Sequence, residues 1–172
     1  MVQAVLSGLQ ENTSKQVYMS VSDNYNVPLQ IRWADLDSNG HLRHSAYYDF
    51  ASTVRINFLS DRGLTINKLA EFRLGPVLFR EEAIFKKEIH LEDKISVSTE
   101  LTKSTSDYSR WSFRHQFTKE DGTIAAFVNV DAAWINLDLR KLGKSNDFIV
   151  NVFSEFKKSD DFQWVVPSTK KS

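Results

Sequence analysis

The feature that most constrains this chain is a polar turn between an extended run and an amphipathic helix. Gln30 to Trp33 are typical of extended chain, and Ser38-Asn39-Gly40 is a turn signal, because Asn and Gly accept the positive φ that a chain reversal needs. From Ser45 onward, apolar side chains recur every three or four residues, which predicts one buried helix face: Tyr47, Phe50, Ala51, Val54 and Phe58. Arg62-Gly63 is typical of a helix end, so we expect a helix of about 17 residues.

Runs of alternating residues follow this helix with short connections. We expect strands at 77–89, 94–101, 108–117 and 123–137, and Asp121-Gly122 between the last two is a hairpin signal. Hairpin-length connections make antiparallel pairs, so the fold class is α+β. A helix that is apolar over more than half its circumference requires a curved antiparallel β-sheet wrapped around it.

Three further elements are expected outside this pattern. The first strand covers Asn26 to Ala34, and a short helix with Thr65 as its N-cap covers 65–72 and is broken by Gly75-Pro76. A last amphipathic helix covers 146–157. We therefore divide the chain into an N-terminal extension (1–25), a central α+β domain (26–142) and a C-terminal helical extension (143–172).

Composition excludes several classes of function. The chain has no cysteine, so disulfides, a thiol nucleophile and thiolate metal ligands are excluded. With 22 basic and 22 acidic side chains, the formal charge is zero, and no basic excess predicts a nucleic-acid partner. Residues 1–15 lack the pattern of a signal peptide and no apolar run approaches membrane-spanning length, so we expect a cytoplasmic protein without a membrane partner.

The run from Arg32 to Tyr48 carries a resemblance. Arg32-Trp33-Ala34-Asp35-Leu36-Asp37-Ser38-Asn39-Gly40-His41, followed by Tyr47-Tyr48 and the helix, resembles the hot-dog-fold acyl-CoA thioesterases, in particular the 4-hydroxybenzoyl-CoA thioesterase-like family. Many members have Gly-His-Val-Asn-Asn where this chain has Gly-His-Leu-Arg-His, so both amides are missing. The resemblance implies a hot-dog fold, an acyl-CoA substrate, no cofactor, and a homodimer or homotetramer with sites at the subunit interface.

The same resemblance places the catalytic carboxylate at Asp37. Thioester cleavage needs one carboxylate at the carbonyl carbon, together with backbone N–H donors for the oxyanion, which a helix N-terminus and its turn provide. We expect the amides around Gly40 to Ala46 to serve here. The alternative is that Asp35 and Asp37 only shape the turn or cap the helix; for Asp35, orienting the turn is the interpretation that we adopt.

Two histidines follow Asp37. Relatives of the Tol-Pal-associated type have a histidine that maps onto His44, so His44 is a second catalytic candidate, with a helix-cap role as the alternative. His41 is assigned to the substrate-binding side of the turn, where it supports the turn or contacts the partner subunit. A His41-x-x-His44 metal pair lacks a third ligand at matched spacing, so we expect no metal site.

Arg43 and Tyr47 complete the predicted substrate-binding set with Gly40 and His41. Arg43 could reach a CoA phosphate or remain solvated, and Tyr47 could line an acyl tunnel or belong to the core. The predicted activity is acyl-CoA hydrolysis to a carboxylic acid and CoA, with Asp37 as nucleophile or general base. The alternatives are another hot-dog enzyme, a thioester dehydratase or hydratase, and a non-catalytic acyl-CoA-binding module.

Overall fold

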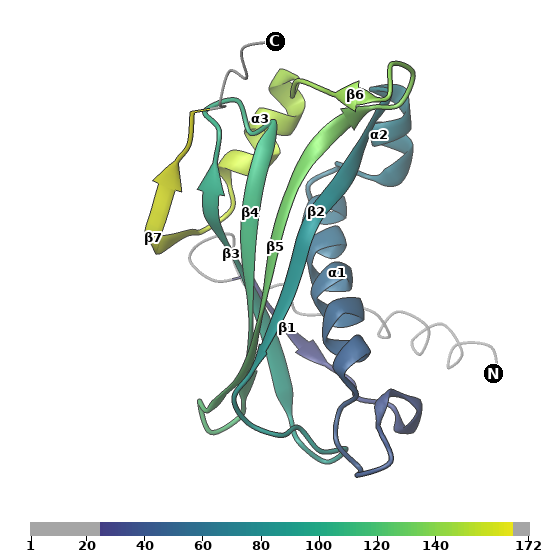
Figure 1. The fold of residues 1–172 in the computed structure, drawn as a ribbon, viewed down its shortest axis with the longest axis vertical. Helices are drawn as coiled ribbons and strands as arrows, with labels where there is room; N and C mark the ends of the chain where they lie inside the picture. Colours follow the sequence, from purple (N-terminus) through teal and green to yellow (C-terminus); the bar gives the residue numbers. More distant parts are fainter. Residues whose placement is uncertain (1–24, 167–172) are drawn as a thin grey trace, which may run out of the picture.

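The protein is described here as a computed structural model that covers residues 25–166. A curved, mainly antiparallel sheet wraps around the long helix α1, His44–Asp61 (Figure 1). Its main strands lie in the order β1-β3-β4-β5-β2. Their bounds are β1 (Asn26–Leu29), β2 (Leu74–Phe85), β3 (Ile95–Ser104), β4 (Arg110–Lys119) and β5 (Ile124–Asn136). This arrangement confirms the predicted α+β hot-dog fold. The predicted N-terminal extension lies outside the described residues except for Tyr25.

Helix α1 begins one residue before the predicted Ser45 and ends where Arg62-Gly63 predicted. Gly63 has φ +80°, its N–H donates to Ser60 O at 2.9 Å, and the N–H of Leu64 donates to Leu59 O at 2.9 Å, which caps the last turn. The buried face is Ala46, Tyr47, Ala51, Val54, Arg55, Phe58 and Leu59. Within residues 25–166, no helix is both long enough and apolar enough to cross a lipid bilayer.

The inward faces of β3, β4 and β5 follow the predicted alternation and form the core with α1. Their buried side chains include Val97, Leu101, Trp111, Phe113, Phe117, Val128, Val130 and Trp134. A hydrogen-bonded polar set lies among them: His115 Nδ1 is 2.8 Å from Thr99 Oγ1, and its Nε2 is 3.0 Å from Arg55 Nη1. All three residues are buried, so this hydrogen-bonded set joins α1 to the sheet inside the core.

The first strand is shorter than predicted. It ends at Leu29 instead of Ala34, and Trp33–Asp35 forms the 3-10 helix η1. The cause is Asp35, whose carboxylate accepts hydrogen bonds from the Arg32 backbone N–H at 2.9 Å and from its guanidinium at 2.8 Å, which folds the chain back. The indole of Trp33 is 81% exposed as a result.

Helix α2, Ile66–Glu71, confirms the second predicted helix, with Thr65 Oγ1 accepting the N–H of Lys68 at 3.2 Å. The expectation that Gly75-Pro76 acts as a break is wrong, because both residues lie inside β2. Strand β2 is an edge of the sheet, where a proline without an N–H is tolerated. The strand therefore starts earlier than the predicted residue 77 and ends at Phe85, before the predicted residue 89.

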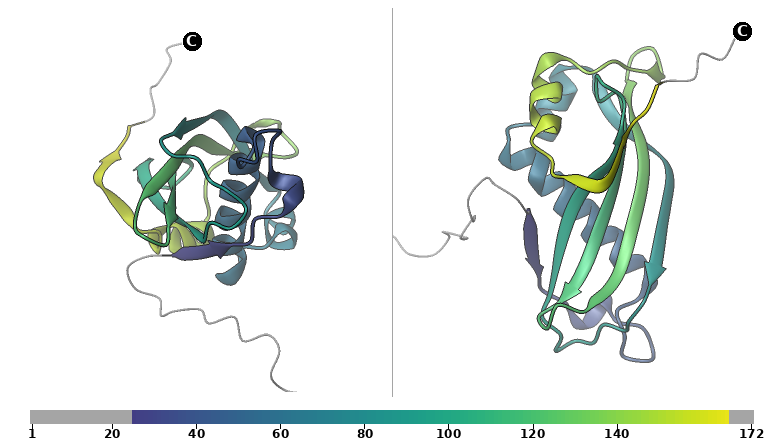
Figure 2. Two further views of the ribbon diagram at one scale, coloured as in Figure 1. Left: turned by 90° about the horizontal axis from the view of Figure 1, so that it is seen from below. Right: turned by 90° about the vertical axis from the view of Figure 1, so that its left-hand side faces the viewer.

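Residues after 142 complete the same core. The predicted helix over 146–157 is the shorter helix α3, Asp147–Ser154, which is capped by the Asn146 side chain and lies on the same side of the sheet as α1 (Figure 2). Its Phe153 is buried, and the following Phe156 stacks on Phe58 with ring centroids 3.6 Å apart. Two short strands were not predicted: β6 (Lys141–Leu142) pairs with β5, and β7 (Lys158–Trp164) pairs parallel to β3.

Candidate active site

The turn between η1 and α1 is built around the Asp37 carboxylate. Its Oδ1 accepts the backbone N–H groups of Asn39 at 2.8 Å and His41 at 3.1 Å. The backbone closes the same turn, since the Asp37 N–H donates to His41 O at 2.8 Å and the Gly40 N–H donates to Asp37 O at 3.1 Å. Gly40 has φ +78°, the conformation that its place in the turn signal predicted.

These hydrogen bonds set the charge of Asp37. The two N–H donors lower the pKa of its carboxyl from the ordinary value, so the group is ionised at neutral pH. The side chain is exposed, and within residues 25–166 its Oδ2 makes no hydrogen bond. One oxygen of Asp37 therefore shapes the turn while the other remains available to react.

Asp35 has a different environment. Its carboxyl is only 2% exposed, and hydrogen bonds from Arg32 lower its pKa. Its backbone O accepts the Arg43 N–H at 2.9 Å, which fixes the entry of α1. Asp35 does not line the cavity beside Asp37. This placement agrees with the interpretation that Asp35 orients the turn.

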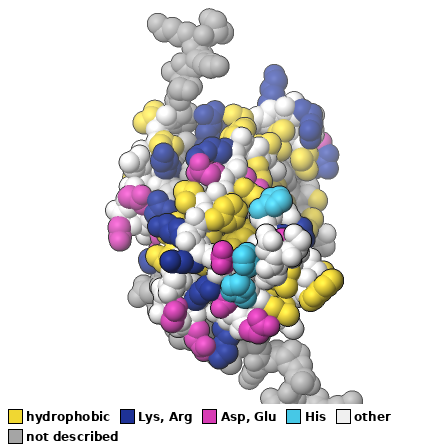
Figure 3. All heavy atoms as spheres, turned by 60° about the horizontal axis from the view of Figure 1, so that its bottom comes forward, with side chains coloured by type: hydrophobic (Ala, Val, Ile, Leu, Met, Phe, Trp, Pro, Cys, Tyr) yellow, Lys and Arg dark blue, Asp and Glu magenta, His cyan; other side chains and the backbone are white. Residues whose placement is uncertain are grey.

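A cavity of about 370 Å³ opens beside the turn, at the N-terminal end of α1. Its walls come from the turn, from α1 and from the end of β2 with the segment that follows it. The lining residues are Asp37, His41, Leu42, His44, Tyr47, Phe85, Lys86, Lys87 and Glu88. Seen from this end of the molecule, histidine side chains lie beside an apolar surface, with acidic and basic groups around them (Figure 3).

Four of the residues predicted for the site line this cavity: Asp37, His41, His44 and Tyr47. His44 is the first residue of α1 and is exposed, and no side chain caps this helix end within the described part of the chain. Tyr47 is buried against Phe85 and Phe117, with ring centroids 5.0 and 5.1 Å away. Burial, followed by the charge of Asp37, raises the pKa of Tyr47 to about 12, so its phenol keeps its proton.

Two predicted site residues do not line the cavity. The Arg43 guanidinium donates to Ser45 Oγ and lies 3.7 Å from a carboxylate oxygen of Asp49, so it is directed along α1. Gly40 lies at the exposed tip of the turn and acts through its backbone conformation.

The backbone hydrogen bonds reduce the number of N–H groups that are available to stabilise the oxyanion. Between Gly40 and Ala46, the N–H groups of residues 40, 41, 42, 43 and 46 already donate to oxygens inside the protein. Within the described residues, only the N–H groups of His44 and Ser45 in this stretch have no acceptor. These are the first two N–H groups of α1, at the positive end of its dipole.

Comparison with known protein families decides the identity at family level. The sequence profile of the thioesterase-like superfamily matches residues 31–162. The chain belongs to this superfamily. The assignment agrees with the thioester-hydrolase class that the resemblance implied. A comparison with curated protein sequences gives no match.

Several solved structures have a fold similar to that of this thioesterase-like protein. Staphylococcus aureus SAV2348, determined in complex with CoA, has a TM-score of 0.73 at 18% identity over 88% of this chain and 93% of its own. The Synechocystis 1,4-dihydroxy-2-naphthoyl-CoA thioesterase Slr0204 has a TM-score of 0.69 at 16% identity, covering 77% and 96%. The DHNA-CoA thioesterase of Staphylococcus aureus has a TM-score of 0.66 at 18% identity, covering 76% and 86%.

The sequence did not reveal one wall of the cavity of this thioesterase-like protein. The sequence predicted Phe85 to Glu88 as part of a long strand. In the structure, the chain leaves the sheet after Phe85. The N–H groups of Lys86 and Lys87 both donate to Ala125 O, at 2.9 and 3.0 Å. The same segment brings Glu88 and His90 next to His41. The cluster of charged residues directly after the strand was the only sequence signal for this wall.

Proposed function

We propose that the protein is an acyl-CoA thioesterase in which Asp37 is the reacting carboxylate. One observation carries the proposal. A single cavity contains an ionised carboxylate with one free oxygen, and this carboxylate lies on the turn that leads into a helix whose first two N–H groups are free. Thioester hydrolysis requires this pair of groups, a negative oxygen for the carbonyl carbon and N–H donors for the oxyanion.

In the proposed reaction, Asp37 Oδ2 attacks the thioester carbon, and the carbonyl oxygen becomes an oxyanion held by the His44 and Ser45 N–H groups. The C–S bond then breaks, CoA leaves as a thiolate that takes a proton, and water hydrolyses the acyl–Asp37 anhydride to regenerate the carboxylate. The lowered pKa of Asp37 keeps its carboxylate deprotonated at neutral pH, as attack on the carbonyl carbon requires. His44 lies in the same cavity and is proposed to supply the proton.

The substrate class is supported by the charges at the cavity. Lys86 and Lys87 line the cavity and supply cations for the phosphates of CoA, while Tyr47, Phe85 and Leu42 supply apolar surface for the acyl group. The fold is also that of SAV2348, which was determined with CoA. Arg43 is left out of the CoA-binding set, because its guanidinium is occupied on α1.

A homodimer is also proposed. Strand β2 is an open edge of the sheet in the chain, and four of its apolar side chains are between 42% and 60% exposed: Leu78, Phe79, Ile84 and Phe85. An exposed apolar edge strand pairs readily with a second copy. Phe85 also lines the cavity, so pairing through β2 would bring the partner next to the site. Sedimentation velocity should give a dimer for the native chain and a shift towards monomer for Phe79→Arg.

Thiol release from a panel of short, long and aromatic acyl-CoAs tests the activity. Asp37→Asn should reduce kcat/KM by about 10²- to 10⁴-fold, because the amide cannot attack the carbonyl carbon. Asp121→Asn is the matched control: Asp121 is also exposed in a turn, accepts a backbone N–H at 2.9 Å and has a lowered pKa, but it does not line the cavity.

Three outcomes would contradict parts of the proposal. Thiol release that survives Asp37→Asn would remove Asp37 from the reaction. Binding of acyl-CoA without thiol release would favour the non-catalytic binding module. Reaction of unsaturated or hydroxylated acyl-CoAs only, with saturated ones untouched, would favour the dehydratase or hydratase alternative, because those reactions cannot turn over a saturated chain.

A further inference from the structure

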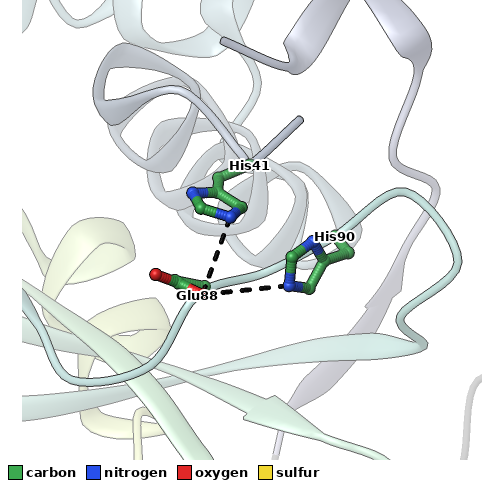
Figure 4. A group of neighbouring side chains, drawn as sticks. All are labelled: His41, Glu88 and His90. Carbon is green, nitrogen blue, oxygen red and sulfur yellow. Dashed lines mark ion pairs between the residues drawn. The ribbon is translucent and has the colours of Figure 1, made fainter. Parts of the chain in front are cut away.

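Three side chains beside the cavity converge on one point. His41 comes from the Asp37 turn, and Glu88 and His90 come from the segment between β2 and β3 (Figure 4). His41 Nε2 lies 3.6 Å from Glu88 Oε2, and His90 Nε2 lies 4.0 Å from the same oxygen. All three potential ligand atoms lie within 4.8 Å of one another.

The backbone holds this cluster together. His41 and His90 face each other in an antiparallel bridge, and the neighbouring Leu42 N–H donates to Ile89 O at 2.7 Å. The His90 N–H donates to Asp93 Oδ2 at 2.8 Å, which fixes the far side of the segment. The two imidazole rings meet edge to face, with centroids 4.8 Å apart. The chain path therefore places the two histidines next to each other.

Two imidazole nitrogens and a carboxylate oxygen are a ligand set that suits first-row divalent metals, Zn²⁺ above all. With bonds of about 2.0–2.2 Å, tetrahedral ligand atoms lie roughly 3.3–3.6 Å apart. The separations of 3.6 and 4.0 Å from Glu88, with every pair of ligand atoms within 4.8 Å, reach this range through side-chain rotations. Such rotations are available, because the side chains of Glu88 and His90 are 68% and 49% exposed.

We infer that His41, Glu88 and His90 form a binding site for one divalent transition-metal ion at the rim of the cavity. His41 and Glu88 line the cavity, so the remaining coordination position would face it. The His41 N–H donates to Asp37 Oδ1, so a bound ion would hold the residue that shapes the Asp37 turn. The hydrolysis proposed for Asp37 needs no metal, so this site goes beyond the proposed function.

The sequence pointed to another metal pair, His41 with His44, and gave it no third ligand. The chain has four histidines, and His115 is fully buried and bonded to Thr99 and Arg55, so it cannot contribute. Two sets remain, and they share His41. One uses His90 and Glu88, the other uses His44, and substitutions can separate them.

The test is metal binding by the full, tag-free chain after treatment with a chelator. Titration calorimetry with Zn²⁺ at neutral pH should give one ion per chain with micromolar or tighter affinity, and Co²⁺ should give the visible absorption bands of a low-coordinate site. His90→Ala and Glu88→Gln should each weaken binding by about 100-fold or more, since loss of even an indirect supporting contact costs 10- to 100-fold. His44→Ala is the matched control and should bind the ion as the native chain does.

Specific results would overturn the inference. One is the absence of Zn²⁺ binding up to about 1 mM, the weak end of the affinity scale. The other is binding that persists in His90→Ala and is lost in His44→Ala. Two controls distinguish loss of a metal ligand from misfolding: the variant His90→Gln, and thermal unfolding of each variant measured in the presence of chelator. Binding is read directly, so a chain that binds Zn²⁺ and hydrolyses no acyl-CoA contradicts only the proposed function, and hydrolysis without metal binding contradicts only this site.

Discussion

The two ends of α1 differ in how closely they pack against the sheet. At the C-terminal end, Phe58 stacks on Phe156, the Arg62 guanidinium lies 3.5 Å from the Phe58 ring centroid, and α3 fills the space beneath β4 and β5. At the N-terminal end, the wall beside Tyr47 remains open as a cavity of about 370 Å³. The first end is a packed core and the second is the proposed active site, so substitutions at the two ends should affect different measurements.

The largest effect on stability is expected at the packed end. Phe153 is fully buried, and its ring lies within 6 Å of those of Tyr108, Trp111, Phe113, Trp134 and Phe156. Phe153→Ala should lower the free energy of unfolding by about 3–5 kcal/mol, because it leaves a cavity among rings that cannot collapse. Urea unfolding measures this loss, while thiol release per folded molecule should not change.

Phe148→Ala is the control for this substitution. Phe148 lies on the same helix, but its side chain is 37% exposed, so its loss should cost much less. If Phe153→Ala abolished thiol release in a chain that is still folded, the separation between the two ends would be wrong.

A smaller effect is expected from the buried His115. Burial, followed by the positive charge of Arg55, lowers its pKa well below 6.5, so it is neutral in the folded protein. The unfolded chain takes up a proton near pH 6.5 and the folded one does not, so this contribution to stability is complete above pH 6.5 and is lost as the pH falls. The free energy of unfolding should decrease by up to about 1.4 kcal/mol per pH unit between pH 6.5 and 5.

Urea unfolding at a series of pH values checks this slope. His115→Gln should flatten it in that window. An equal slope in the native chain and His115→Gln would show that another group is responsible. The carboxyl groups with lowered pKa values, such as Asp37, lose their contribution only at a lower pH, near and below 4.

The smallest effect on stability is expected at two glycines in turns. Gly40 and Gly122 have φ +78° and +84°, and a Cβ at either position would meet no atom within 4 Å. Gly40→Ala and Gly122→Ala should therefore each cost about 1 kcal/mol of stability, from backbone strain alone. Only Gly40→Ala should also lower kcat for thiol release, because it distorts the turn that carries Asp37. Equal kcat values for the two variants would show that this turn tolerates displacement.

Local pattern in the sequence was sufficient for the helices and most strands. The apolar period of α1, its end at Arg62-Gly63 and the alternation in β3 and β4 all correspond to side chains that are buried in the structure. These features depend on neighbours within one element. The placement of Asp37, His44 and Tyr47 around one cavity follows from the same local path.

Long-range contacts could not be predicted in this way. Glu88 and His90 are more than 40 residues from His41 and meet it only because the chain after β2 bridges back to the turn. Strand β7 pairs in parallel with β3, which lies far earlier in the sequence, and α3 comes between them. Because the sequence of β7 is short and mostly polar, it did not predict this pairing. Arg55 was hidden for another reason: a charged residue on a helix is read as exposed, and its partner His115 lies 60 residues away.

The strands β1 and β7 have a consequence for how the sheet can grow. Both lie along the outer side of β3, β1 beside Ile95 to Ser98 and β7 beside Leu101 to Ser104, so most of that edge is closed by the chain itself. The outer strands of the described sheet are therefore β2, with 12 residues, on one side and the shorter β1 and β7 on the other. The long, apolar β2 edge is suited to pair with one further copy about a twofold axis, and such pairing uses up that edge. On the other side, β7 carries Lys158, Asp160 and Asp161, and charges on an outer strand oppose pairing with a further chain.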